Sequence, residues 1–219
     1  MDEPCVVDIL ENGINGIALD VNLRGSIGRT SALHEAVRND NSEIVSLLVA
    51  EDGINLNIMN SGEYAATPLL NAVALNSHNM IRLLLEAGAD PNTARLPDLR
   101  TPLHEIVVVG YDFGNTHLMF RPLVEAGAAV NGVDEDSVTP LMLAVEKNDL
   151  TLVELFLAEG ADANSADNKG RKVLGYLQID ANDELIYRSV IHCIPCTPCI
   201  CLLYGVLIQW KNSAKLLRF

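Results

Sequence analysis

The heptapeptide TPLHEIV, residues 101–107, is one of five similar stretches that recur along the chain. The others are SALHEAV from Ser31, TPLLNAV from Thr67, TPLMLAV from Thr139 and a degenerate copy, KVLGYLQ, from Lys172. Their starting positions are separated by 36, 34, 38 and 33 residues. A repeat of this period is typical of a solenoid protein, in which each unit packs on its neighbours.

A second motif recurs at the far end of each unit and keeps the same register. EDGINLN ends at Asn57, EAGADPN at Asn92, EAGAAVN at Asn131 and AEGADAN at Asn164, and a stretched form, ENGINGIALDVN, ends at Asn22. Two independent motifs in one phase argue against chance recurrence, and together they define the units.

Each unit is predicted to hold two short antiparallel helices. Threonine caps the first helix and proline takes its first position, because a threonine oxygen accepts a free N–H group and proline has none to satisfy. The chain then reverses at Asp40, Asn76, Gly110 or Asn148, residue types that tolerate the left-handed conformation. Apolar residues at helical spacing predict the second helix, as in NMIRLLLEAG, and a glycine ends it.

The pattern resembles the ankyrin-repeat family, whose units carry T-P-L-H near the start and G-A-D-x-N near the end. The resemblance implies an all-α ankyrin-repeat solenoid over residues 1–191. The expected units are 30–60, 67–95, 101–134 and 139–167, with a partial unit at 4–22, a degenerate fifth at 168–191 and a separate tail at 192–219. The structural motif positions are Thr67, Pro68, Thr101, Pro102, Thr139, Pro140, His34, His104, Gly88, Gly127 and Gly160.

Several positions depart from the family motif. Leu70 and Met142 replace the histidine, and SALH lacks the proline. The third unit has extra residues after Gly110, and Pro122 is expected to shorten or kink its second helix because proline removes a helical hydrogen bond.

Composition limits the class of protein and of partner. The chain has 219 residues, of which 49% are hydrophobic and 20% charged, so it holds enough apolar groups for a sizeable core. Its formal charge of -14 disfavours nucleic acid and anionic lipid, and favours a basic or neutral protein partner. No cysteine interrupts residues 6–192, and no charged-then-apolar leader opens the chain, which favours an intracellular setting, cytoplasmic or nuclear.

His104 and Glu105 are candidates for acid–base catalysis, but adjacent helical residues point about 100° apart. The resemblance implies instead that His104 ties the start of its helix to threonine and neighbouring backbone, and that His34 does the same. Neither HEAVR nor HEIVV completes an H-E-x-x-H zinc motif, and the sequence has no GxSxG, Walker or G-x-G-x-x-G motif. The chain is therefore predicted to be non-catalytic, with no cofactor and no metal site.

The resemblance implies a protein–protein interaction module or adaptor that binds on a concave face of first helices and loop tips. The expected contact residues are Arg38, Asn39, Tyr64, Leu75, Arg100, Val108, Val109, Glu146 and Lys147. Further loop-tip and helix-end positions are Arg29, Glu63, Asp98, Asp136, Lys169 and Arg171. The acidic run DEDS, residues 134–137, is the most charged tip, although a solvated loop is the simpler interpretation because exposed acids contribute little individually.

The tail HCIPCTPCICLLYGVLIQW, residues 192–210, has no Lys, Arg, Asp or Glu and holds four cysteines. A metal site is disfavoured because the C-x2-C-x2-C-x-C spacing does not match zinc or iron–sulfur motifs. Membrane attachment, with Lys211, Lys215 and Arg218 cytoplasmic, is an alternative that Pro195 and Pro198 weaken, and it makes a membrane-tethered repeat protein the alternative function. The favoured interpretation is a helix that covers the last unit, or a poorly ordered tail from alternative splicing.

Overall fold

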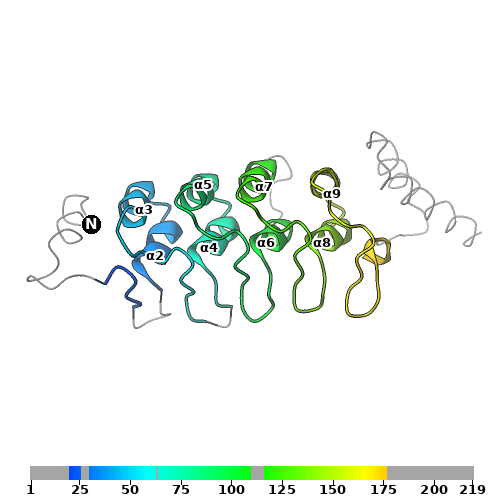
Figure 1. Cartoon of the computed structure of the whole chain (residues 1–219), viewed down its shortest axis with the longest axis horizontal. Helices are drawn as coiled ribbons and strands as arrows, with labels where there is room; N and C mark the ends of the chain where they lie inside the picture. Colours follow the sequence, from blue (N-terminus) through cyan, green and yellow to red (C-terminus); the bar gives the residue numbers. More distant parts are fainter. Residues whose placement is uncertain (1–19, 26–29, 63, 110–115, 177–219) are drawn as a thin grey trace, which may run out of the picture.

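The computed structural model describes residues 20–25, 30–62, 64–109 and 116–176. The first helices of the units are α2 (Ala32–Arg38), α4 (Pro68–Ala74), α6 (Pro102–Val109) and α8 (Pro140–Glu146). The second helices are α3 (Ser42–Val49), α5 (His78–Glu86), α7 (Thr116–Glu125) and α9 (Leu150–Ala158), and a short 3-10 helix, η1 (Val173–Tyr176), follows. Figure 1 shows the first helices in one row and the second helices in a parallel row, with loops projecting from one edge. The expected all-α solenoid of stacked helix pairs is confirmed.

The projecting loops are hairpins, each closed by a backbone hydrogen bond. Four of them are hairpin 60–66, hairpin 95–100, hairpin 134–138 and hairpin 167–171, in which the first residue donates its N–H to the carbonyl of the last. Each hairpin lies between one unit's second helix and the next unit's first helix. The first helices and the hairpins therefore share one face of the stack, which we call the inner face.

The first helices begin where the sequence predicts. The Thr67 hydroxyl accepts the N–H of Leu70 at 3.2 Å, and the Thr139 hydroxyl accepts the N–H of Met142 at 3.3 Å. In the unit without proline, the Ser31 hydroxyl accepts the N–H of His34 at 3.4 Å. A hydroxyl cap of this kind contributes about 1 kcal/mol to helix stability. The cap at Ser31 shows that it forms without a following proline.

The turns between the helices have the backbone conformation that their residues tolerate. Asp40, Asn76 and Asn148 have φ of 51°, 55° and 56°, in the left-handed region. Short polar side chains adopt this region more readily than most, because they form local hydrogen bonds. Gly110, the fourth predicted turn residue, lies outside the described residues.

The second helices end at glycines, as predicted for Gly88, Gly127 and Gly160. Their φ values are 95°, 92° and 81°, which residues with a side chain rarely adopt. At Gly88 the N–H donates to the Leu85 carbonyl, and the next N–H, that of Ala89, donates to the Leu84 carbonyl. These bonds satisfy carbonyls that the end of a helix otherwise leaves without partners.

The core lies between the two rows of helices. Leu33, Leu69, Leu103 and Leu141 occupy the same position in successive units, and each is 0 or 1% exposed. Between the last two second helices, the rings of Phe120 and Phe156 meet edge to face at a centroid distance of 5.0 Å. Such contacts join one unit to the next, so the core is continuous along the stack.

Asparagines from the second motif link consecutive units. The Asn92 side chain donates to the Gly127 carbonyl at 3.0 Å and accepts the Ala129 N–H at 2.7 Å. Asn131 makes the same pair of bonds one unit later, to Gly160 and Asp162. The recurrence of Asn in each unit therefore has a physical cause, since its amide carries both a donor and an acceptor for the next unit's turn.

The effect predicted for Pro122 is wrong in one respect, because the proline does not shorten its helix. α7 has 10 residues and continues past Pro122 to Glu125. Because proline has no N–H, the Leu118 carbonyl four residues earlier lacks its helical partner, and Leu118 is 46% exposed.

Several predictions lie outside the described residues. They concern the partial unit 4–22 up to residue 19, the fifth unit beyond residue 176, and the cysteine-rich tail 192–219. Within the described residues, no helix is long and apolar enough to span a membrane.

Candidate protein-binding surface

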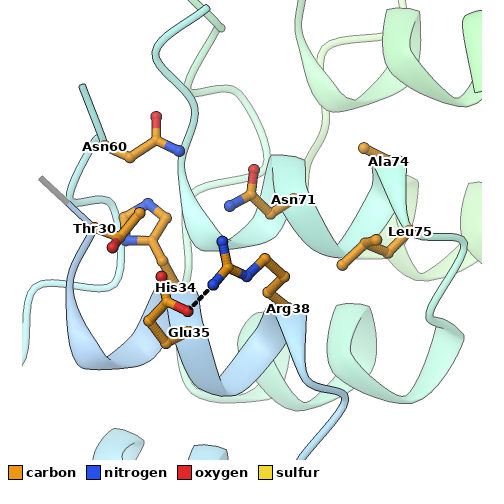
Figure 2. Close-up of a pocket in the computed structure, with 8 residues that line it drawn as sticks. All are labelled: Thr30, His34, Glu35, Arg38, Asn60, Asn71, Ala74 and Leu75. Atoms are coloured by element: carbon orange, nitrogen blue, oxygen red, sulfur yellow. Dashed lines mark hydrogen bonds and ion pairs between the residues drawn. The ribbon is translucent and has the colours of Figure 1, made fainter. Parts of the chain in front are cut away.

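A pocket of about 280 Å³ opens on the inner face between the first two units. Its lining comes from α2, from α4 and its C-cap residue, and from Thr30 and Asn60 outside the helices. The residues around it are Thr30, His34, Glu35, Arg38, Asn60, Asn71, Ala74 and Leu75. Figure 2 shows that two of the predicted contact residues, Arg38 and Leu75, come to this one pocket from neighbouring helices.

The charged groups of the pocket are paired with each other. Arg38 forms an ion pair with Glu35, one helical turn earlier, marked by the dashed line in Figure 2. Their side chains are 63% and 38% exposed, so water screens the pair and it adds little to stability.

His34 forms the floor of the pocket and is held on both sides. Its Nδ1 lies 2.9 Å from the Ser31 hydroxyl, and its Nε2 lies 3.0 Å from the Ala66 carbonyl. Burial lowers the pKa of His34 below its ordinary value of 6.5, so the ring is neutral at neutral pH. With both ring nitrogens engaged, His34 has a structural role, as predicted.

His104 repeats this arrangement two units later. Its Nδ1 lies 2.8 Å from the Thr101 hydroxyl and its Nε2 lies 3.0 Å from the Val138 carbonyl. Burial lowers its pKa too. The neighbouring Glu105 does not face the imidazole and instead pairs with Arg95, so the two residues do not form an acid–base pair.

Glu105 belongs to a charge cluster between α6 and hairpin 95–100. Arg95 lies at its centre, with Nη1 3.1 Å from Glu105 and Nη2 2.6 Å from Asp98. Arg100 lies 3.6 Å from the same Asp98 carboxylate. Burial raises the pKa of Glu105, whereas at Asp98 the hydrogen bonds and charge of Arg95 outweigh burial and lower the pKa. The cluster fixes hairpin 95–100 against the first helix of the next unit.

The predicted contact residues are exposed at the ends of the first helices, with one correction. Leu75 is 50% exposed and Val108 is 38% exposed, while Arg38, Asn39, Glu146 and Lys147 are also exposed and Arg100 is half-buried. Val109 is only 9% exposed and is not a contact residue. It is still within α6, three residues after the buried Ile106, and residues at this spacing share a helix face.

The predicted loop-tip residues differ in the roles their side chains have. Tyr64 is 54% exposed on hairpin 60–66, and Asp136 and Lys169 are exposed on hairpins 134–138 and 167–171. Arg171 pairs with Asp167 at 2.8 Å. Within the acidic run 134–137, Asp134 is buried and accepts the N–H groups of Asp136 and Val138, so it shapes the hairpin rather than a contact surface. Arg29 and Glu63 lie outside the described residues.

Asn60, Asn71 and Arg95 are not among the predicted contact residues of the inner face, and the sequence indicates Glu105 only as a possible partner of His104 rather than of Arg95. Asn71 and Glu105 occupy the position of Glu35 in their own units, four residues after the capping Ser or Thr. This position is polar in the first three units, but in the fourth it is Leu143, so the sequence gives only a partial signal. Arg95 carries no such signal, because its partners are 3 and 10 residues away across a turn.

The described residues contain no group of three or more His, Cys, Asp or Glu placed to hold a metal ion. The cysteines at 193–201, for which a metal site was considered, lie outside them.

Comparison with protein families finds ankyrin repeats in both halves of the chain. Residues 3–95 match a model described as ankyrin repeats (3 copies), and residues 123–176 match one described as ankyrin repeats (many copies). These ranges include the first two complete units and the last complete one.

Several curated proteins match most of this chain, two of them as parts of longer proteins. The chain is 30% identical over 165 residues to the fowlpox virus ankyrin repeat protein FPV014, covering 75% of this chain and 35% of that protein. It is 31% identical over 157 residues to the nuclear factor NF-kappa-B p105 subunit of Gallus gallus, covering 72% of this chain and 15% of that protein. A further fowlpox virus ankyrin repeat protein, FPV230, is 29% identical, with 66% of this chain and 90% of that protein covered. The chain thus spans about a third or less of the first and second of these.

Proposed function

Because the chain belongs to the ankyrin-repeat family, whose repeats are generally protein–protein interaction modules, we propose that it binds a protein partner on its inner face without catalysing a reaction. The observation that carries this proposal is the pocket between α2 and α4. It combines an exposed apolar side chain, Leu75, with an exposed guanidinium, Arg38, around a space of about 280 Å³.

The composition of the pocket suits the anchor residue of a protein partner. Interface energy is concentrated in a few side chains that fill pockets, surrounded by groups that exclude water. Leu75 and Ala74 supply apolar surface, while Asn60 and Asn71 supply amide donors and acceptors. A partner side chain that is apolar with a polar end would contact the apolar surface and also hydrogen-bond to the amides.

The scaffold around the pocket is fixed before the partner arrives. His34 holds α2 to the carbonyl of Ala66, next to α4, and Asn22 accepts the Asn55 N–H at 2.7 Å in the following unit. A surface already ordered in the free protein loses little conformational entropy on binding. Affinity then depends on the anchors themselves.

The charge of the chain favours a basic or neutral partner. At a formal charge of -14, acidic proteins and nucleic acid are repelled at long range, while basic proteins are attracted. We include in the proposal an adaptor role in an intracellular setting, because residues 6–192 contain no cysteine for disulfides.

Quantitative affinity purification tests the proposal with two matched double variants. Arg38→Ala with Leu75→Ser alters the pocket, and Arg82→Ala with Leu118→Ser removes the same chemistry from the second helices, where Arg82 is 64% and Leu118 46% exposed. We expect a partner that the wild-type and second-helix variants retain equally and that the pocket variant loses, with purified-partner affinity reduced about tenfold or more. A partner retained equally by all three proteins contradicts binding at the pocket.

A further inference from the structure

Large apolar side chains are exposed together at the tips of two adjacent hairpins. Tyr64 on hairpin 60–66 is 54% exposed, and Leu96 and Leu99 on hairpin 95–100 are 45% and 43% exposed. The two hairpins are joined by a pair of backbone hydrogen bonds of 2.9 Å between Ala65 and Leu96. We call Tyr64, Leu96 and Leu99 the apolar tip.

The backbone conformation of Leu99 is energetically unfavourable. Its φ of 56° lies in the left-handed region, which is unusual for a bulky side chain and costs about 1–2 kcal/mol per residue. A glycine or asparagine would remove much of that cost at this turn. The next-to-last residues of hairpins 134–138 and 167–171, Ser137 and Gly170, also have positive φ, so the hairpin requires this conformation, and only hairpin 95–100 of the three places a large apolar residue there.

Tyr64 is also held in place. The Arg95 guanidinium lies 5.1 Å from the centre of the Tyr64 ring, and Arg95 is itself fixed by Asp98 and Glu105. An aromatic side chain that stays exposed yet ordered contributes strongly to an interface, because little entropy is lost when a partner covers it.

The charges next to the apolar tip change sign along the hairpins. The Glu135 N–H donates to the Asp98 carbonyl at 3.0 Å, which places hairpin 134–138 beside hairpin 95–100. Glu135 and Asp136 are exposed there. One unit further, the Asn168 N–H donates to the Asp136 carbonyl at 2.9 Å, and Lys169 is exposed on that hairpin. The order along this edge is apolar, acidic, then basic.

We propose that the hairpin edge binds an extended segment of a partner protein, with a large apolar side chain on the apolar tip and Lys or Arg facing Glu135 and Asp136. The proposal rests on the protein-binding function above and adds the chemistry of the partner. Neighbouring units lie about 10 Å apart, as packed helices do, and an extended chain advances about 3.3 Å per residue. The basic residue therefore follows or precedes the apolar one by about three positions, and an acidic residue facing Lys169 lies about three further on.

Selection from a phage-displayed library of random linear peptides, on the immobilised full chain, tests this pattern. We expect enriched peptides to carry a large apolar residue and a basic residue at that spacing. Synthetic copies are then measured by fluorescence anisotropy, with affinity falling as sodium chloride rises because the acidic contacts are exposed. Enriched peptides in which acidic residues take the place of the basic ones overturn the proposal.

Three variants of the full chain separate the proposal from the function it rests on. Tyr64→Ser with Leu99→Asn removes the apolar tip, Glu135→Gln with Asp136→Asn removes the acidic charge, and Arg38→Ala with Leu75→Ser alters the pocket. We expect the first two to weaken peptide binding at least tenfold, and by more than the third does. Peptides whose binding is weakened only in the pocket variant overturn the hairpin proposal but support inner-face binding. Peptides insensitive to all three overturn both, and circular dichroism confirms that each variant is folded.

Discussion

The imidazole of His104 donates from Nε2 to the carbonyl of Val138, 3.0 Å away and 34 residues later in the chain. The Thr101 N–H donates to the other ring nitrogen at 3.2 Å, so the hydrogen lies on Nε2. One buried ring thus connects the start of its own helix to the residue before the capping threonine of the next unit's first helix. His34 makes the equivalent connection to Ala66.

His104→Ala should lower the free energy of unfolding by about 1–3 kcal/mol, because the Val138 carbonyl loses its buried donor. Equilibrium unfolding in urea measures the change. His117→Ala is the matched control, since His117 is exposed on α7 and its loss should change the stability by less than about 0.5 kcal/mol. Equal effects of the two substitutions would contradict a linking role for His104.

The stability of the fold should decrease as the pH falls below 6.5. Burial lowers the pKa of His34 and His104 below that ordinary value, so the unfolded chain binds their protons first. The stability that the two neutral histidines contribute therefore rises as the pH increases from their lowered pKa values to 6.5, and it reaches its full value above 6.5. Glu105 has the opposite sign, because its raised pKa means that the folded state takes up the proton first as the pH falls.

Urea unfolding between pH 7 and pH 5 isolates the histidine contribution. The variant His34→Met with His104→Met places at both sites the residue that Met142 already supplies in the fourth unit. We expect a smaller loss of stability with falling pH in this variant than in the wild type. An unchanged slope would show that the buried histidines do not control the pH dependence.

Leu103→Ala should destabilise the fold by about 2–5 kcal/mol, because Leu103 is 0% exposed and its truncation leaves a cavity. Thermal and urea unfolding both report the loss. Leu118→Ala is the matched control, since the Leu118 side chain is 46% exposed on α7. A comparable loss of stability in the control would contradict the assignment of Leu103 to the core.

Gly88→Ala should cost about 1 kcal/mol or more, because Gly88 has a φ of 95° that alanine rarely adopts. Gly62→Ala is a useful contrast, since a Cβ at Gly62 meets nothing within 4 Å and its φ is ordinary. There we expect no loss, or a gain of up to about 1 kcal/mol from a less flexible unfolded chain. Differential scanning calorimetry distinguishes the two, and equal effects would contradict the conformational explanation.

Leu99→Asn should stabilise the free protein by about 0.5–1 kcal/mol, because asparagine tolerates the left-handed conformation that Leu99 adopts. The same substitution should weaken binding at the apolar tip. Urea unfolding measures the first effect, and a destabilised variant would contradict the assignment of strain to Leu99.

The helices, their caps and their turns could be predicted from the sequence because each depends on residues close together. A threonine or serine whose hydroxyl accepts the N–H three residues later acts locally, as does an asparagine at a turn. The period and register of the repeat predict how the units stack, since each unit must present the same apolar positions to its neighbours. The linking role of Asn92 also recurs, but its partners lie 35 and 37 residues away, and only the structure identifies them.

The inner face was predicted less completely. Leu75 and Val109 have the same place in their units, eight residues after Thr67 and Thr101, yet Leu75 caps a helix and is exposed while Val109 is still helical and buried. One extra residue of helix decides which side chain faces solvent. The Arg95 cluster was missed because its contacts depend on how hairpin 95–100 folds back onto α6.

The account depends on each unit folding only against its neighbours. Circular dichroism of an isolated peptide of residues 67–100, heated alongside the full chain, tests this most directly. We expect the full chain to unfold cooperatively and the peptide to show little helix and no cooperative transition, because a single helix pair cannot bury its apolar face. A stably helical peptide that melts cooperatively on its own would contradict the account.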